Sequence, residues 1–176
     1  MTFDQASVLS IPGKTPRVDP TAFLAHGARV IGDVTLDAEV SIWYNAVVRA
    51  DSGSVTIGAG SNIQDNVSVH VDAAHPVVIG RGVSVGHNAV VHGCTIEDDC
   101  LIGMGSVVLS GAVIGTGSLV AGGAVVLEGT IIPPGSLVAG VPARVRRELT
   151  ADEKAGLVGN AQAYLRHTAS HRGART

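Results

Sequence analysis

Three histidines stand in an aliphatic stretch that otherwise has the composition of a protein core. His70 ends the run "VSVH", and His87 and His92 lie in "VSVGHNAVVHG". Burying an imidazole is costly unless both ring nitrogens find partners, so their grouping suggests a shared task. Three neutral imidazoles around an ion with one open position are the arrangement of catalytic zinc, which lowers the pKa of bound water to about 7. The alternative is three unrelated surface histidines.

A repeat of six residues determines how these histidines are placed. From residue 96 onward, aliphatic side chains recur at every sixth position, namely Ile96, Ile102, Val108, Ile114, Val120, Val126, Ile132 and Val138. This period fits neither a helix nor a plain alternating strand; it predicts short strands joined by turns, with one aliphatic residue per repeat pointing inward. Three repeats make one coil of a triangular parallel β-helix, whose coils stack at strand spacing, roughly 4.8 Å. We therefore expect an all-β solenoid.

The repeat is irregular around the histidines. Insertions break its phase in "RADSGS" and "HVDAAHP", and the segment from Val85 to Ile96 is one residue short. With the second insertion removed, His70 and His92 are one coil apart, so they should lie side by side on an outer face. His87 falls at a corner, too far round the coil to share their ion within one chain. Packing of three prisms would bring the corner histidine to a neighbour's pair, which predicts a homotrimer with three interfacial sites.

The β-helix gives way to a different pattern near the C-terminus. Thr150 and Glu153 have capping-box spacing, which indicates a helix beginning at Ala151. The residues expected to share its packed face are Leu157, Ala161, Tyr164 and Leu165. The expected units are a β-helix domain over 1–148 with a lead-in over 1–20, and a C-terminal helix and tail over 149–176, disordered from residue 169.

Composition and charge exclude several classes of function. The net charge of −3 and the pI near 6.1 give no electrostatic reason to expect nucleic acid or an anionic membrane surface. The sequence contains neither a signal-peptide pattern at its N-terminus nor a run of roughly 18 apolar residues. Cys94 and Cys100 do not form a CxxC motif, and we expect two buried thiols in a reducing compartment. These features predict a cytoplasmic protein without a membrane or nucleic-acid partner.

Two segments carry a more specific resemblance. "NAVVRADSGSVTIGAGSNIQDNVSVHV" and "IGRGVSVGHNAVVHGCTIEDDCLIGMGSVVL" resemble the γ-class carbonic anhydrases and their bacterial relatives, through the motifs "RAD", "NIQD", "VH", "GHN" and "HGC". The repeat itself resembles the left-handed parallel β-helix of hexapeptide-repeat proteins. The resemblance implies an enzyme for the metal-dependent, reversible hydration of carbon dioxide to bicarbonate by a metal-bound hydroxide at trimer interfaces. One divalent metal per subunit is implied, with zinc expected first and iron or cobalt as alternatives.

The resemblance also assigns roles to individual residues. His70, His87 and His92 match the metal ligands, with His87 contributed across the interface. Gln64 in "NIQD" matches the glutamine beside metal-bound water, where its amide accepts the hydroxide proton and leaves a lone pair aimed at carbon dioxide. Asn62 matches another polar residue of that pocket.

Charged residues near these ligands match interface residues of the family. The glutamates that some relatives carry near the site are not found in this chain. Arg49 and Asp51 match an ion pair that joins subunits, and Asp65 matches a carboxylate near the same arginine. Some relatives carry a glutamate directly after the "R-x-D" aspartate, where this chain has Ser52, and another in an acidic loop after the first histidine. That loop is short here, and its His75 is the candidate proton shuttle because its unperturbed pKa is near 6.5.

Other interpretations remain open from the sequence. Tyr164 could reach the pocket from the C-terminal helix or serve in the core. One alternative function is a metal-binding relative with weak or no hydratase activity, acting as a thioesterase or in an assembly. Another is a hexapeptide acyltransferase, because "PPGSLVAGVPAR" resembles the end of acetyl-CoA-binding members. Those enzymes use one histidine as a general base and need no metal, so three histidines beside "NIQD" argue against them.

Overall fold

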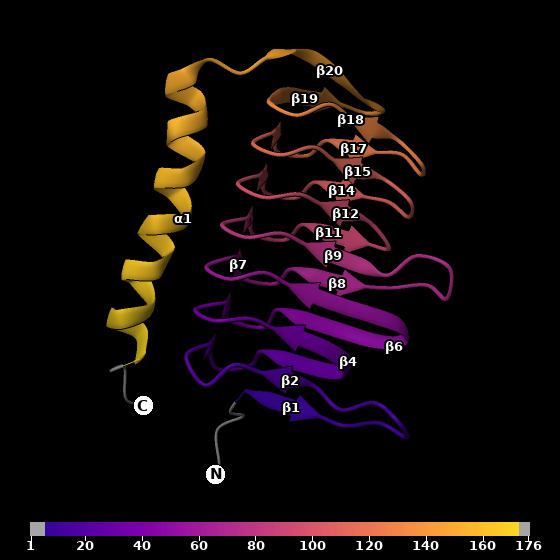
Figure 1. Cartoon of the computed structure of the whole chain (residues 1–176), viewed down its shortest axis with the longest axis vertical. Helices are drawn as coiled ribbons and strands as arrows, with labels where there is room; N and C mark the ends of the chain where they lie inside the picture. Colours follow the sequence, from indigo (N-terminus) through magenta and orange to yellow (C-terminus); the bar gives the residue numbers. More distant parts are fainter. Residues whose placement is uncertain (1–5, 173–176) are drawn as a thin grey trace.

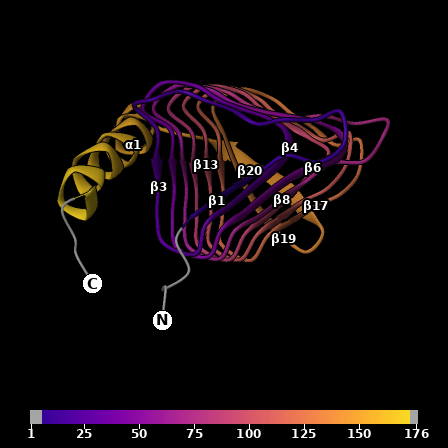
Figure 2. The same cartoon turned by 90° about the horizontal axis from the view of Figure 1, so that it is seen from below.

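The chain folds into a parallel β-solenoid followed by a helix. The computed structural model describes residues 6–172. Successive coils stack from the N-terminus upward, and the helix α1 (Ala151–Arg172) returns along the outside of the stack (Figure 1). Seen end-on, the coils form a three-sided prism with α1 next to the side that carries β3 (Phe23–Leu24) (Figure 2). The expected fold class, a hexapeptide-repeat β-helix with a C-terminal helix, is confirmed.

Each side of the prism is built from strands that pair in parallel with the coil above and below. The first face contains β1 (Ser7–Leu9), the first parts of β4 (Arg29–Leu36) and β6 (Val47–Ile57), β8 (Ser68–His70), β11 (Val90–His92), β14 (Val107–Val108) and β17 (Val125–Val126). The second face contains β2 (Arg17–Val18), the later parts of β4 and β6, β9 (Val77–Ile79), β12 (Thr95–Ile96), β15 (Val113–Ile114) and β18 (Ile131–Ile132). Because β4 and β6 run across a corner, these two faces form one continuous sheet.

The third face includes the strands at which the solenoid ends. It contains β3, β5 (Ser41–Ile42), β7 (Asn62–Ile63), β10 (Ser84–Val85), β13 (Leu101–Ile102), β16 (Leu119–Val120) and β19 (Ser136–Gly140). The antiparallel strand β20 (Ala143–Glu148) then pairs with β19 and closes the top of the sheet. Because β20 lies antiparallel, it ends the parallel series, and the chain leaves towards the helix.

The register of the strands follows the predicted repeat and its breaks. In the regular part, Thr95 pairs with Val113, eighteen residues further on. Asn62 pairs with Ser84, twenty-two residues on, and Ser84 pairs with Leu101, only seventeen residues on. The longer step contains the predicted four-residue insertion, and the shorter one contains the predicted missing residue.

Small branched side chains fill the interior in layers. Inward-pointing residues of successive coils, such as Ile96, Ile102 and Ile114, are completely buried. Full burial of one such side chain contributes about 1.5–3 kcal/mol. Large aromatic side chains are absent from this central cluster among the described residues, and Phe23 and Trp43 form a separate outer cluster under α1.

Helix α1 begins at the predicted residue because its capping box forms. The Glu153 N–H donates to the Thr150 hydroxyl at 3.2 Å, and the Thr150 N–H donates to the Glu153 carboxylate at 2.9 Å. Arg147 donates twice to the same carboxylate, at 2.7 Å each, and the pKa of Glu153 falls to about 2, chiefly through this hydrogen bonding. β20 ends at 148 and α1 begins at 151, on either side of the predicted domain boundary, which stays a prediction.

The expected disordered tail from residue 169 is wrong for residues 169–172, which continue α1. The ring of His171 packs against Trp43 with centroids 4.9 Å apart, and its Nδ1 lies 2.8 Å from the Tyr44 hydroxyl. These contacts hold the last turn against the third face. Residues 1–5 of the predicted lead-in and 173–176 of the predicted tail lie outside the described residues, and the rest of the lead-in forms β1 and β2. Nothing helical between residues 6 and 172 has the length and apolar character needed to cross a membrane.

A first prediction concerns a glycine where two coils approach closely. A Cβ at Gly103 would lie 2.5 Å from the Gly122 nitrogen and 2.7 Å from the Ala121 carbonyl carbon. Gly103→Ala should therefore lower the free energy of unfolding by about 1–3 kcal/mol through overpacking. Gly156→Ala, whose Cβ in α1 would meet no atom within 4 Å, is the control and should raise stability by up to about 1 kcal/mol. Denaturant unfolding that leaves Gly103→Ala at wild-type stability would contradict the register described here.

A second prediction concerns the two cysteines, which are buried free thiols as expected. Burial raises the pKa of Cys94 and of Cys100 to about 12. Because the thiolate is the reactive form, neither thiol should react with iodoacetamide in the folded protein, and both should react after denaturation. Mass spectrometry of the alkylated protein checks this. Rapid labelling under native conditions would contradict the burial.

Candidate functional site

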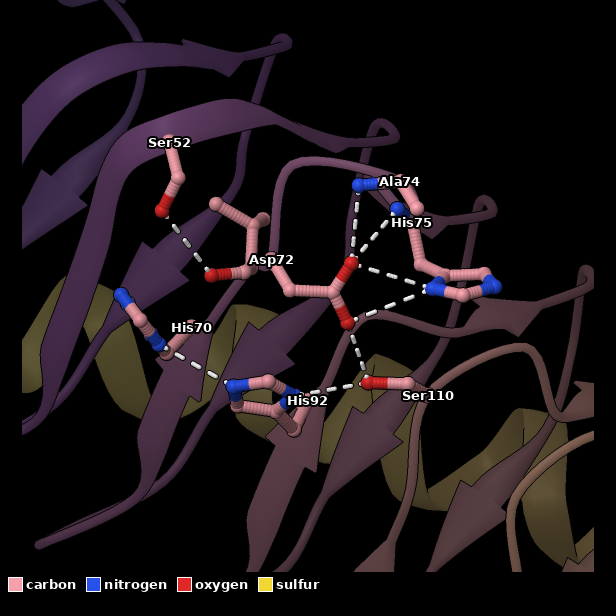
Figure 3. A network of polar contacts seen from close by, with 8 residues as sticks. Ser52, His70, Asp72, Ala74, His75, His92 and Ser110 are labelled. Carbon is pink, nitrogen blue, oxygen red and sulfur yellow. Dashed lines mark hydrogen bonds and ion pairs between the residues drawn. The ribbon is translucent and has the colours of Figure 1, made fainter.

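Two of the three predicted ligands lie side by side on the first face. His70 ends β8, His92 ends β11, and the two residues are paired across these parallel strands. Nδ1 of His70 and Nε2 of His92 are 3.1 Å apart, and the ring centroids are separated by 5.1 Å (Figure 3). The predicted stacking of these two histidines is confirmed.

Charged residues of β6 surround the outer nitrogen of the pair. Asp51 Oδ1 lies 2.9 Å from His70 Nε2, and Arg49 forms an ion pair with the other oxygen of Asp51. The hydrogen bond from His70, together with Arg49, holds the pKa of the Asp51 carboxyl well below its usual range. Arg49 and Asp51, expected as a pair that joins subunits, therefore contact each other within one chain.

The third predicted ligand lies at the corner where the third face turns into the first. His87 stands in the turn between β10 and β11, one coil beyond Asp65 and two beyond Tyr44. His87 Nδ1 is 2.8 Å from Asp65 Oδ2. A carboxylate can only accept, so it keeps the imidazole proton on Nδ1 and leaves Nε2 with its lone pair. The hydroxyl of Tyr164 lies 3.3 Å from that Nε2.

A buried chain of amides fixes Gln64 beside the corner histidine. Gln64 Nε2 donates to Asn62 Oδ1 at 3.0 Å, and Asn62 Nδ2 donates to the Ser84 hydroxyl at 2.9 Å. The backbone N–H of His87 donates to Gln64 Oε1 at 3.2 Å. Asn62 is completely buried and Gln64 almost so. This chain determines which end of the Gln64 amide is the acceptor, and one lone pair of Oε1 remains for another donor.

A pocket of about 300 Å³ opens between this corner and α1. Its lining residues are Trp43, Tyr44, Asp65, His87, Tyr164, His167 and His171. Burial, with a smaller contribution from Asp65, raises the pKa of Tyr164 above its ordinary value. Sequence reasoning named Tyr164 but missed Trp43, Tyr44 and the two helix histidines. The position of Tyr44, one coil before Asp65, was the available signal.

The predicted site residues thus form two groups on one chain. The pair side consists of His70, His92, Arg49 and Asp51, and the corner side consists of His87, Asp65, Gln64, Asn62 and Tyr164. Among residues 6–172, no three His, Cys, Asp or Glu side chains gather as a metal-binding group. His87 does not join the pair within a single chain, as the register predicted.

The residues present fit a metal ion when the two groups are considered together. On the pair side, two ring nitrogens converge at 3.1 Å; on the corner side, a carboxylate-held imidazole leaves Nε2 as a donor. Imidazole nitrogens of this kind suit zinc, iron or cobalt. The side chains of His70 and His87 remain 26% and 37% exposed, so both groups stay open to a partner.

His75, the candidate proton shuttle, lies in the loop between β8 and β9, which projects from the edge of the stack (Figure 1). Its Nδ1 is 3.0 Å from Asp72 Oδ1. Asp72 also accepts a hydrogen bond from Ser110, whose hydroxyl oxygen lies 2.9 Å from His92 Nδ1. His75 is therefore on the side of His92 that faces away from His70 (Figure 3).

Comparison with known proteins gives consistent matches. Residues 93–128 match the family model for the bacterial transferase hexapeptide (six repeats). The chain is 43% identical over 171 residues to the mitochondrial gamma carbonic anhydrase 1 of Arabidopsis thaliana, covering 94% of this chain but 62% of that protein. It therefore spans about three fifths of the length of that relative.

Two further matches extend over most of both chains. The carbonic anhydrase of Geobacillus kaustophilus is 47% identical over 141 residues, covering 80% of this chain and 78% of that protein. The solved structure of a hexapeptide transferase family protein from Anaplasma phagocytophilum is 38% identical, with a TM-score of 0.90, covering 97% of this chain and 99% of the other. These similarities, over the coils that carry the histidines, show that the chain belongs to the γ-carbonic-anhydrase-like family of hexapeptide-repeat proteins.

Proposed function

We propose that this protein catalyses the metal-dependent, reversible hydration of carbon dioxide at the interfaces of a homotrimer. Carbon dioxide and water give bicarbonate and a proton. The observation that carries the proposal is the division of three imidazoles into a facing pair and a carboxylate-held corner residue, all of them accessible on one chain. The activities named for the relatives point the same way.

The positions of the two groups on the prism support the proposed trimer. The corner side precedes the first face along each coil, and the pair side stands at the end of that face. Three prisms packed around a three-fold axis, each with this face turned towards the axis, would bring the corner side of one copy against the pair side of the next. Each interface would then hold His70 and His92 from one subunit and His87 from the other.

The chemistry is divided between the ion and the surrounding side chains. His70, His87 and His92 would hold a divalent cation, which would lower the pKa of coordinated water to about 7 and so supply hydroxide at neutral pH. Asp65 keeps the His87 proton on Nδ1, away from the ligating nitrogen. Gln64 Oε1 keeps one lone pair free beside His87, and this lone pair would accept the hydroxide proton and so orient the hydroxide oxygen towards carbon dioxide. Asn62 maintains that orientation through its hydrogen bond to Gln64 Nε2.

Several narrower expectations belong to this proposal. Zinc is the first metal to test, with iron and cobalt as alternatives. Tyr164 would form part of the pocket wall beside His87. His75 has a side chain that is 46% exposed and is proposed to pass protons to solvent at the rim of the site. Arg49 and Asp51 would contribute to the interface next to the pair, with Asp65 facing them from the neighbouring subunit. The cytoplasmic location stays a prediction.

Acyl transfer is the weaker reading of this site. The family model whose description names transferases matches only residues 93–128, a range that leaves out all three histidines. In that chemistry one histidine acts alone as a general base, whereas each histidine here shares its nitrogens with a carboxylate, a hydroxyl or a second imidazole.

A third prediction tests the division of ligands between subunits. His87→Ala and His92→Ala should each lose bound metal and hydratase activity. When the two variants are unfolded, mixed and refolded together, mixed trimers should regain sites, because an intact His87 meets an intact pair at some interfaces. Metal content and activity of the mixture give the result. His26→Ala, which changes a histidine outside both groups, is the control and should resemble the wild type. Failure of the mixture to recover would mean that the ligands are not shared in this way.

A fourth prediction tests the reaction. Stopped-flow carbon dioxide hydration should depend on bound metal in protein loaded with zinc, or with iron under anaerobic conditions. Gln64→Ala should retain metal but lower kcat by about 10²–10³-fold, the usual effect of removing one preorganised hydrogen-bonding group. One metal per subunit without hydration in either preparation would contradict the hydratase proposal and favour a thioesterase or assembly role.

A further inference from the structure

We propose that Asp72 and Ser110 position His92 for metal binding by holding the imidazole proton on Nδ1. The proposal rests on the proposed function in one respect, namely that His92 is taken to be a ligand. Neither residue belongs to the pair side or the corner side. The chain of contacts runs from the β8–β9 loop through Ser110 to the outer nitrogen of His92 (Figure 3).

The direction of the hydrogen bonds follows from what each group can donate. An ionised carboxylate has no proton to give, so the Ser110 hydroxyl donates to Asp72 Oδ2 at 2.7 Å. Having used its only proton, Ser110 Oγ must accept at its 2.9 Å contact with His92 Nδ1. Neutral His92 therefore carries its proton on Nδ1, and Nε2 keeps its lone pair.

The same reasoning, applied to the contact between His70 and Asp51, determines which nitrogen of His70 carries the proton. Asp51 accepts from His70 Nε2 at 2.9 Å, which leaves Nδ1 of His70 with its lone pair. The two nitrogens that face each other at 3.1 Å are then both acceptors. Two lone pairs at that distance repel unless a cation lies between them, so a carboxylate at each end turns the pair into a cation-binding arrangement.

The local fold accommodates this relay, the hydrogen-bonded series from His92 through Ser110 to Asp72. Asp72 Oδ1 accepts the backbone N–H groups of Ala74 and His75 at 2.9 Å each, which fixes the carboxylate within the inserted loop. A Cβ at Gly93 would lie 2.7 Å from Ser110 Oγ and 3.2 Å from Asp72 Oδ2. The glycine of "HGC" therefore leaves the space in which the hydroxyl and the carboxylate meet. The four-residue insertion thus supplies the carboxylate of this contact.

Asp72→Asn is a sharp test because it keeps a side chain of the same size but reverses the direction of the hydrogen bonds that run from Asp72 through Ser110 to His92. The asparagine Oδ1 can still accept the two loop N–H groups, while its amide nitrogen now donates to Ser110 Oγ. The hydroxyl proton is then free to point at His92 Nδ1, which moves the imidazole proton to Nε2 and blocks the nitrogen that faces His70. Loss of such an outer hydrogen-bond partner typically lowers metal affinity about 10–100-fold.

The experiment measures zinc affinity by chelator competition on the full-length protein. Asp72→Asn and Ser110→Ala should each bind zinc about 10–100-fold more weakly than the wild type. Ser110→Thr, which keeps the hydroxyl, should restore affinity. Asp98→Asn is the matched control, because Asp98 also accepts a backbone N–H, that of Arg81 at 2.8 Å, but forms no hydrogen bond or ion pair with a histidine among residues 6–172. Wild-type affinity in both Asp72→Asn and Ser110→Ala would overturn the proposal.

A second measurement separates this inference from the proposed function. Nitrogen-15 chemical shifts of His92 would be measured in metal-free protein at a pH well above the ordinary imidazole pKa. They should report the Nδ1–H tautomer in the wild type and its loss in Asp72→Asn. A wild-type His92 with its proton on Nε2 would overturn the relay even if hydration activity is found. The expected tautomer in a protein without hydratase activity would support the relay while the proposed function fails.

Discussion

In-register stacking of parallel coils is the constraint on which the rest of the structure depends. Each strand bonds to the strand one coil away, so residues far apart in sequence become immediate neighbours at a fixed place on the prism. His70 and His92 meet because their strands pair, and Asp65 reaches His87 because their turns stack. Side chains that contact each other on a face are thus one coil apart in sequence, and an insertion or a missing residue changes which side chains meet.

Stacking also explains what the sequence could predict. The hexapeptide period, the paired histidines and the corner placement of His87 all follow from counting residues around a coil, and the structure bears these out. The capped start of α1 was visible because Thr150 and Glu153 act locally. Counting fails where the chain leaves the coil. The seating of His171 on Trp43 depends on a helix packed across several coils, so the end of that helix was misjudged.

Side-chain networks through loops were equally hidden from the sequence. Ser110 lies one residue beyond the position that aligns with His92 in the next coil, so the repeat could have brought it close to His92, but Asp72 comes from an insertion that the repeat cannot place. Among the described residues of the regular coils beyond Ile96, Ser110 is the side chain that joins this network. Irregularity in this fold therefore coincides with chemistry, because a perfect repeat offers only equivalent positions and a site needs unequal ones.

The separation of the pair side from the corner side also bears on assembly. A site whose ligands come from two copies links ion occupancy to subunit association, since each ion that binds the assembled form stabilises it relative to separate chains. The concentration of available metal would then set how strongly the subunits associate. In the proposed trimer, metal limitation would weaken the association between subunits, and dilution of the protein would favour release of its ions.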